Sequence, residues 1–121
     1  MVVGDLHEPF CLDGYLEFIK ATYKKYKLNK VVFIGDIIDS HFSSYHETSA
    51  DGMGGKYELE QAIKKLAKWY KAFPNADVTL GNHDRLIIRK AETSGVPSQW
   101  IREFGDVLKT PKWNFVTDVY Y

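Results

Sequence analysis

The stretch that most constrains the fold is Val-Val-Phe-Ile-Gly-Asp-Ile-Ile-Asp, at residues 31–39. Four consecutive apolar residues that end at a glycine are typical of a short, fully buried strand in a parallel sheet. Gly35 permits a sharp turn after the strand because it has no Cβ atom to clash. Asp36 then follows at the carboxyl end of the strand, where open α/β sheets bind their ligands. A carboxylate there needs a cation, an ion pair or hydrogen bonds to offset its burial.

The same pattern of strand, glycine and polar side chains occurs twice more. It appears as Val-Val-Gly-Asp-Leu-His at residues 2–7 and as Val-Thr-Leu-Gly-Asn-His-Asp at residues 78–84. The carboxyl ends of parallel strands lie at one edge of a sheet, so three strand ends are expected to deliver oxygen and imidazole groups to one place. Such a convergence is typical of a metal site.

Helical periodicity fills the segments between the strands. A helix is predicted to begin after Asp13 as its N-cap and to bury an apolar stripe made of Tyr15, Phe18, Ile19, Thr22, Tyr23 and Tyr26. A second helix is predicted over residues 57–73, followed by a strand over 76–80 and a helix over 84–91. A short helix is predicted from Pro97 to near Gly105, with a last strand from Asn114. The predicted fold is α/β: a β-α-β-α-β parallel sheet with flanking helices.

Length and composition fit one soluble domain spanning residues 1–121. Sixteen basic residues balance sixteen acidic ones, so net charge favours neither nucleic acid nor membrane. Cys11 is the only cysteine, which excludes an intrachain disulfide, and a cytoplasmic location without membrane association is expected. The final strand is either a terminal edge strand or part of a longer, incomplete domain. The segment 40–56 lacks periodicity and is expected to be a loop facing the site.

The polar residues of the three turns suit divalent metals such as Mn, Zn, Fe or Ni. Asp5 and His7 are two residues apart in an extended segment, so both side chains can reach one ion. Asp36 has two oxygens with which to bridge two ions, and Asn82 offers a carbonyl oxygen to the second. Two ions held in this way can bind a phosphoryl group and activate a water molecule.

These three motifs resemble the first three signature motifs of the calcineurin-like metallophosphoesterases. The resemblance implies an α/β/β/α sandwich of which this chain is the N-terminal half, and a phosphatase or phosphodiesterase activity that uses two divalent ions, Mg²⁺ among them. It implies that Asp5 and His7 bind the first ion, that Asp36 bridges, and that Asn82 binds the second. The segments at residues 39–47 and 97–100 are similar to segments of phage-type members of this family.

The resemblance also assigns roles in catalysis. His83 contacts the substrate phosphate together with Asn82 and either polarises it or protonates the leaving oxygen, and Asp39 orients His83 and stabilises its charge. Arg85 is a candidate for binding a phosphate oxygen or for a surface ion pair. Asp84 is expected to cap the following helix, with support of the metal ligands as the alternative.

The chain departs from the family pattern in its later part. Its four histidines are His7, His41, His46 and His83, so the late metal-binding histidines of the family are absent, and the chain by itself is expected to hold about one ion or fewer. A missing C-terminal half or an oligomer partner would supply them; recruitment of His41 or His46 is another option. The alternatives are an inactive, truncated module with a partial metal site, or an α/β domain whose carboxylates only cap helices. The substrate stays open among nucleic acids, nucleotides and small phosphoesters.

Overall fold

A parallel four-stranded sheet organises the computed structural model, which describes residues 1–39, 55–95 and 102–116. The strands are β1 (Val2–Val3), β2 (Val31–Ile34), β3 (Ala76–Thr79) and β4 (Asn114–Val116). They lie side by side in the order β1-β2-β3-β4, and every neighbouring pair is parallel. The register places Phe33 between Val3 and Val78. All four strand ends therefore point the same way, as the sequence predicts.

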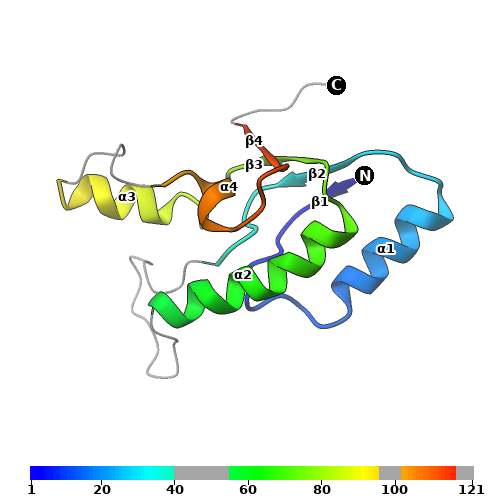
Figure 1. Cartoon of the computed structure of the whole chain (residues 1–121), viewed down its shortest axis with the longest axis horizontal. Helices are drawn as coiled ribbons and strands as arrows, with labels where there is room; N and C mark the ends of the chain where they lie inside the picture. The colour runs from blue at the N-terminus through cyan, green and yellow to red at the C-terminus, as the bar shows by residue number, and fades with distance from the viewer. Residues whose placement is uncertain (40–54, 96–101, 117–121) are drawn as a thin grey trace.

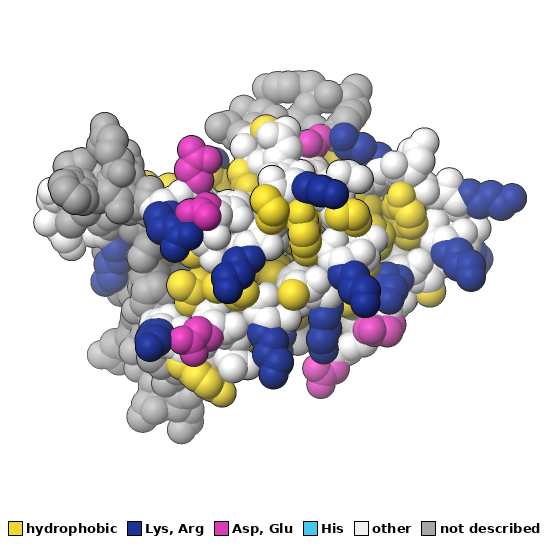
Figure 2. Space-filling view, viewed as in Figure 1, with side chains coloured by type: hydrophobic (Ala, Val, Ile, Leu, Met, Phe, Trp, Pro, Cys, Tyr) yellow, Lys and Arg dark blue, Asp and Glu magenta, His cyan; other side chains and the backbone are white. Residues whose placement is uncertain are grey.

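The helices connect these strands, and α1 and α2 cover one face of the sheet. They are α1 (Tyr15–Lys25), α2 (Gly55–Ala72), α3 (Leu86–Thr93) and α4 (Phe104–Val107). Right-handed crossovers that always step in the same direction place their helices on the same side of a sheet. Figure 1 shows α1 and α2 together beneath the strands, where aromatic rings join the two helices. The result is one α/β layer pair, in agreement with the predicted N-terminal half of a sandwich. Seen from the same side, Lys and Arg side chains are scattered over the outer surface of these helices, with acidic and apolar side chains among them (Figure 2).

The core lies between this face of the sheet and the helices. Phe33 is fully buried, and its ring lies 5.9 Å from that of Trp69 and 4.9 Å from that of Trp113. Trp69 belongs to α2, and its predicted burial is confirmed because only 2% of it is exposed. Contacts between large rings bury much apolar surface, so these three residues anchor α2 and the segment before β4 to the sheet.

The opposite face of the sheet carries apolar side chains that no described helix covers. Val2 is 66% exposed and Ile34 is 55% exposed, whereas Val3 and Phe33, on the helical face, are buried. The prediction of a strand buried on both faces is therefore confirmed for residues 31–33 and is wrong at Ile34. Val32 lies on the same face as Ile34 and is only 6% exposed, so this face is covered at the middle of β2 and open at its end.

The helix α1 departs from its predicted core stripe. Phe18 is 65% exposed and Tyr26 is 63% exposed, although Ile19 is buried. Successive helical residues turn by about 100°, so a helix that packs through Ile19 directs Phe18 away from the core. Tyr26 lies beyond the last residue of α1. The predicted N-cap is also wrong: the N-cap is Gly14, with a φ of 84° and no side-chain cap, rather than Asp13.

The other boundaries shift by small amounts. The second helix begins at Gly55 rather than residue 57, and the third begins at Leu86 rather than residue 84, while β3 ends one residue earlier than predicted. The helix α4 contains Gly105, which was expected to end a helix from Pro97. Most of that predicted helix, at 97–101, and most of the predicted loop, at 40–54, lie outside the described residues.

No helix among the described residues combines the length and the apolar character that a membrane crossing requires.

Candidate metal centre

The turns after β1 and β2 hold three polar residues in the left-handed backbone region. The φ angles are 56° at Asp5, 46° at His7 and 52° at Asp36. Asp and His tolerate this region better than most residues, yet each such position costs roughly 1–3 kcal/mol. The surrounding structure must hold all three in place, and strain of this kind is concentrated at functional sites.

These three side chains converge at the edge of the sheet. The His7 Nε2 atom lies 3.4 Å from Asp5 Oδ1 and 3.9 Å from Asp36 Oδ2. One ligand atom from each residue lies within 4.8 Å of those of the other two. Asp5 and His7 come from the turn after β1, whereas Asp36 comes from the turn after β2, so the neighbouring strands assemble the group.

The orientation of His7 favours metal binding through Nε2. Its Nδ1 atom lies 3.0 Å from Asp39 Oδ1. An ionised carboxylate only accepts hydrogen bonds, so Nδ1 carries the hydrogen and a neutral ring keeps a lone pair on Nε2. That lone pair is on the side of Asp5 and Asp36. A carboxylate that holds a histidine in this manner is the usual partner of a metal-binding imidazole.

The second histidine of the cluster, His83, is oriented by the same residue. Its Nδ1 atom lies 2.7 Å from the backbone oxygen of Asp39 and 3.6 Å from Asp39 Oδ1. A carbonyl oxygen is an acceptor, so Nδ1 donates and Nε2 is left for a ligand. The rings of His7 and His83 meet edge to face, with centroids 4.7 Å apart. His7, Asp39 and His83 form the second group of residues with the spacing of metal ligands.

Asp84 ties the turns after β2 and β3 together. Its side chain is fully buried and accepts hydrogen bonds from the backbone N–H groups of Gly81 at 2.9 Å and Ile38 at 3.1 Å. Burial raises the pKa of Asp84, while these hydrogen bonds lower it. The predicted helix-capping role is wrong, because the N-cap of α3 is Arg85. The carboxyl group of Asp84 instead joins two segments 46 residues apart.

Asp36 makes a second connection between the same turns, since its Oδ1 atom accepts a hydrogen bond of 2.9 Å from the backbone N–H of His83. Its other oxygen, Oδ2, is the one directed toward His7. Asp36 therefore lies at the centre of the cluster: one of its oxygens faces the turn after β1 and the other faces the turn after β3.

Two of the predicted site residues, Asn82 and Arg85, have exposed side chains. They lie in the turn between β3 and α3. Neither side chain forms a hydrogen bond or an ion pair with another described residue. The structure thus brings together Asp5, His7, Asp36, Asp39 and His83. His41 and His46 lie outside the described residues.

Sequence reasoning missed the role of Glu8 in holding His7 in place. The backbone N–H of Glu8 donates to the Ile37 oxygen, and its own carbonyl accepts from the N–H of Asp39, each at 3.0 Å. The N–H of His7 donates to the Asp36 oxygen at 2.8 Å. These bonds continue the pairing of β1 with β2 beyond both strand ends. The irregular backbone of the turns gives no periodic signal by which the sequence would indicate them.

Comparison with known families identifies the class of protein. A model of the calcineurin-like phosphoesterases matches residues 1–120, and the chain belongs to this family. The family supports a metal-dependent phosphoesterase as the general activity. Searches of the curated proteins and of the solved structures found no match.

The residues of the cluster fit the divalent ions that such a family uses. Carboxylate oxygens with imidazole nitrogen suit Mn, Fe, Zn and Ni. Asp5, His7 and Asp36 supply this donor set, and the hydrogen bond from His7 to Asp39 leaves Nε2 in the form that binds metal.

Proposed function

We propose that this chain hydrolyses phosphomonoesters or phosphodiesters with divalent ions held by Asp5, His7, Asp36 and Asn82. The observation that supports it best is the convergence of His7 Nε2 with the carboxylates of Asp5 and Asp36. Asp36, with one oxygen toward each neighbouring turn, is the natural bridge if two ions bind. Asn82 has an exposed amide that can turn toward an ion or a phosphate oxygen without breaking a side-chain hydrogen bond to a described residue.

The proposed mechanism divides the work between the ions and the protein. When bound, divalent ions supply Lewis acidity to the phosphoryl group and make a water molecule more acidic. His83, whose Nδ1 atom is held by Asp39, donates a proton from Nε2 to the leaving oxygen. Asp39 holds His83 through its backbone oxygen, and its carboxylate, 3.6 Å from Nδ1, stabilises the protonated ring. The exposed Arg85 at the start of α3 binds a phosphate oxygen.

Removal of the bridging carboxylate tests the proposal. Wild type, Asp36→Asn and the exposed control Asp106→Asn are each supplied with Mn²⁺, and release of p-nitrophenol is measured from p-nitrophenyl phosphate and bis(p-nitrophenyl) phosphate. Asp36→Asn is expected to lose activity on whichever ester is hydrolysed, while Asp106→Asn retains it. Equal rates for wild type and Asp36→Asn would refute the proposal. The ratio of the two rates indicates whether monoesters or diesters are preferred.

The role of His83 has its own test, because a proton donor matters most for a poor leaving group. His83→Ala is expected to lower the hydrolysis of phenyl phosphate about 10²–10⁴-fold and that of p-nitrophenyl phosphate much less. The same loss with both substrates would assign His83 to binding rather than to proton transfer.

A second candidate is an incomplete module that holds a single ion and lacks activity by itself. It is favoured by the absence of any histidine after His83 in the chain. Elemental analysis of the Mn²⁺-loaded, desalted protein separates the two candidates. Two ions per chain support the two-metal phosphoesterase, whereas one ion or fewer without hydrolysis supports the incomplete module. Nucleic acids, nucleotides and small phosphoesters are the proposed substrate classes to compare once activity is measured.

A further inference from the structure

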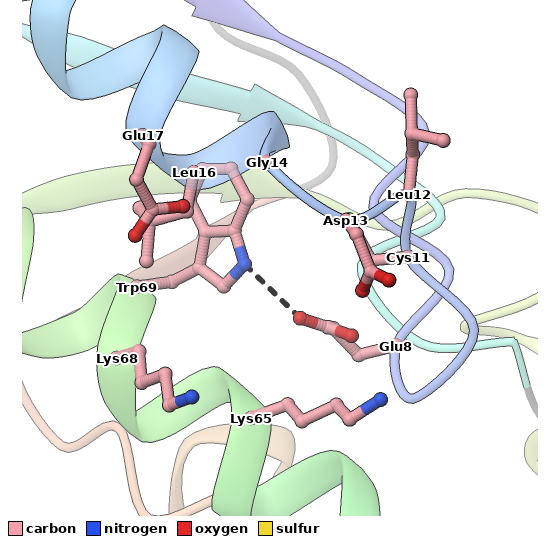
Figure 3. A pocket seen from close by; sticks show the side chains of 10 residues that line it. All are labelled: Glu8, Cys11, Leu12, Asp13, Gly14, Leu16, Glu17, Lys65, Lys68 and Trp69. Atoms are coloured by element: carbon pink, nitrogen blue, oxygen red, sulfur yellow. Dashed lines mark hydrogen bonds between the residues drawn. The ribbon is translucent and has the colours of Figure 1, made fainter.

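A pocket of about 140 Å³ lies between the segment before α1 and the side of α2. Its lining includes none of the proposed metal ligands. Figure 3 shows the Glu8 carboxylate between the indole of Trp69 and the segment of Cys11 and Asp13, with the two lysines of α2 beside it. An engineered cavity of roughly 150 Å³ holds a benzene molecule, so this pocket has room for a ligand of similar size.

The feature that points to a ligand is an unpaired oxygen on Glu8. Only 4% of this residue is exposed. Its Oε2 atom accepts a hydrogen bond of 3.1 Å from Trp69 Nε1, whereas Oε1 has no hydrogen-bond partner. A buried acceptor without a donor is destabilising, and more so when the group is charged. The indole N–H of the buried Trp69 holds the other carboxylate oxygen in place.

The surrounding charges indicate which donor would fit. The exposed carboxylates of Asp13 and Glu17 and the ammonium groups of Lys65 and Lys68 line the pocket together with Glu8. Lys65 already donates to the Pro9 oxygen at 2.7 Å. Three carboxylates against two ammonium groups leave one negative charge, which a monocation neutralises. Among the described residues, the groups spaced for a metal ion lie at the sheet edge and not here.

We propose that this pocket binds a small organic cation with N–H donors, an ammonium or guanidinium compound, through Glu8 Oε1. The cation donates to Oε1, and its carbon skeleton lies against the apolar part of the lining that Trp69 and Leu16 provide. Cations of this kind also interact favourably with an indole ring. The inference does not depend on the proposed phosphoesterase activity.

The indole N–H of Trp69 provides a direct reporter, because it is hydrogen-bonded to Glu8. The ¹⁵N-labelled chain is titrated with guanidinium chloride and with ethylammonium chloride, far below denaturing concentrations. Urea, the neutral analogue of guanidinium, and sodium chloride serve as controls. The Trp69 signal, assigned with Trp69→Phe, is expected to shift and to saturate in about the millimolar range with at least one of the cations. It is expected to stay in place with urea and sodium chloride.

Variants decide whether Glu8 carries the binding. Glu8→Gln is expected to weaken cation binding about tenfold or more, because the cation loses one charged hydrogen bond. Glu60→Gln, a matched change on the exposed part of α2, is expected to leave it unchanged. Glu17→Gln, at the exposed rim of the pocket, is expected to weaken cation binding by about two- to fivefold. This variant tests the proposal even if Glu8→Gln does not fold. No saturable shift with either cation, an equal shift with urea, or unchanged binding by Glu8→Gln or Glu17→Gln would overturn the proposal.

Discussion

A Cβ atom on Gly35 would lie 2.8 Å from both the Cα and the N atoms of Gly81, so the ends of β2 and β3 meet backbone to backbone. A Cβ atom on Gly81 would in turn collide with the side chain and the backbone nitrogen of Asp36. This close approach allows Asp36 to accept the hydrogen bond from the His83 N–H. The two glycines therefore set the spacing between the polar turns that form the candidate metal centre.

Replacement of Gly35 should consequently destabilise the fold far more than replacement of a glycine that has a similar backbone conformation but open space around it. Gly35→Ala meets both a φ of 92° and the clash with Gly81, and should cost about 3 kcal/mol or more in unfolding free energy. Gly14 has a φ of 84° with nothing within 4 Å, so Gly14→Ala should cost only about 1 kcal/mol. Urea denaturation measures both values. Similar losses for the two variants would contradict the account of this contact.

The buried bridge made by Asp84 predicts a graded effect on stability. Asp84→Ala leaves the N–H groups of Gly81 and Ile38 without their acceptor and should cost about 3 kcal/mol. Asp84→Asn retains one carbonyl acceptor and should lose less. Asp106→Asn is the control: it removes only an exposed ion pair with Arg102, which contributes little, and should unfold close to the wild-type urea midpoint. If Asp84→Ala also unfolds at that midpoint, the bridge does not stabilise the turns.

The hydrogen bond between Asp39 and His7 predicts an effect on metal affinity. Without the carboxylate, the His7 ring loses the acceptor that fixes its Nδ1–H form. Asp39→Ala should therefore weaken Mn²⁺ binding about 10–100-fold, the usual effect of removing such a partner. Calorimetric titration at constant pH measures the affinity, with Asp106→Ala as the matched control. Wild-type affinity in Asp39→Ala would show that Asp39 has no part in orienting a metal ligand.

Cys11, which lines the pocket at Glu8, should react slowly with alkylating reagents. Burial, and to a lesser extent the Glu8 carboxylate, raises the pKa of its thiol to about 11. The thiolate is the reactive form, so the fraction able to react is smaller below this pH than for an ordinary cysteine with a pKa of about 8.5. The rate of iodoacetamide alkylation of the folded chain should rise about tenfold per pH unit up to about pH 10. A plateau near the ordinary pKa, as expected in urea, would contradict this prediction.

The parts of the site that the sequence predicts share one local signal. Asp5, Asp36 and His83 each follow an apolar strand and a glycine, and parallel strands bring such positions to one edge whatever the intervening helices contain. The strand order also agrees with the predicted half of a sandwich, because each crossover steps in the same direction.

The remaining features depend on contacts between distant segments, which no local pattern encodes. Asp84 has the sequence context of a helix cap, but the N–H groups of two turns draw its carboxyl group inward. Phe18 follows the periodicity of a core residue, yet the side of α1 that packs is the one with Ile19. Glu8 and Trp69 are 61 residues apart and meet only because α2 packs beside the turn after β1.

The most direct measurement of the central claim is anomalous X-ray scattering from crystals of the chain soaked with Mn²⁺. The account predicts a manganese peak bonded to His7 Nε2 and to carboxylate oxygens of Asp5 and Asp36, and its loss in crystals of Asp36→Asn. A bound ion that contacts none of these three residues, or a wild-type crystal without an ion at this edge of the sheet, would contradict it.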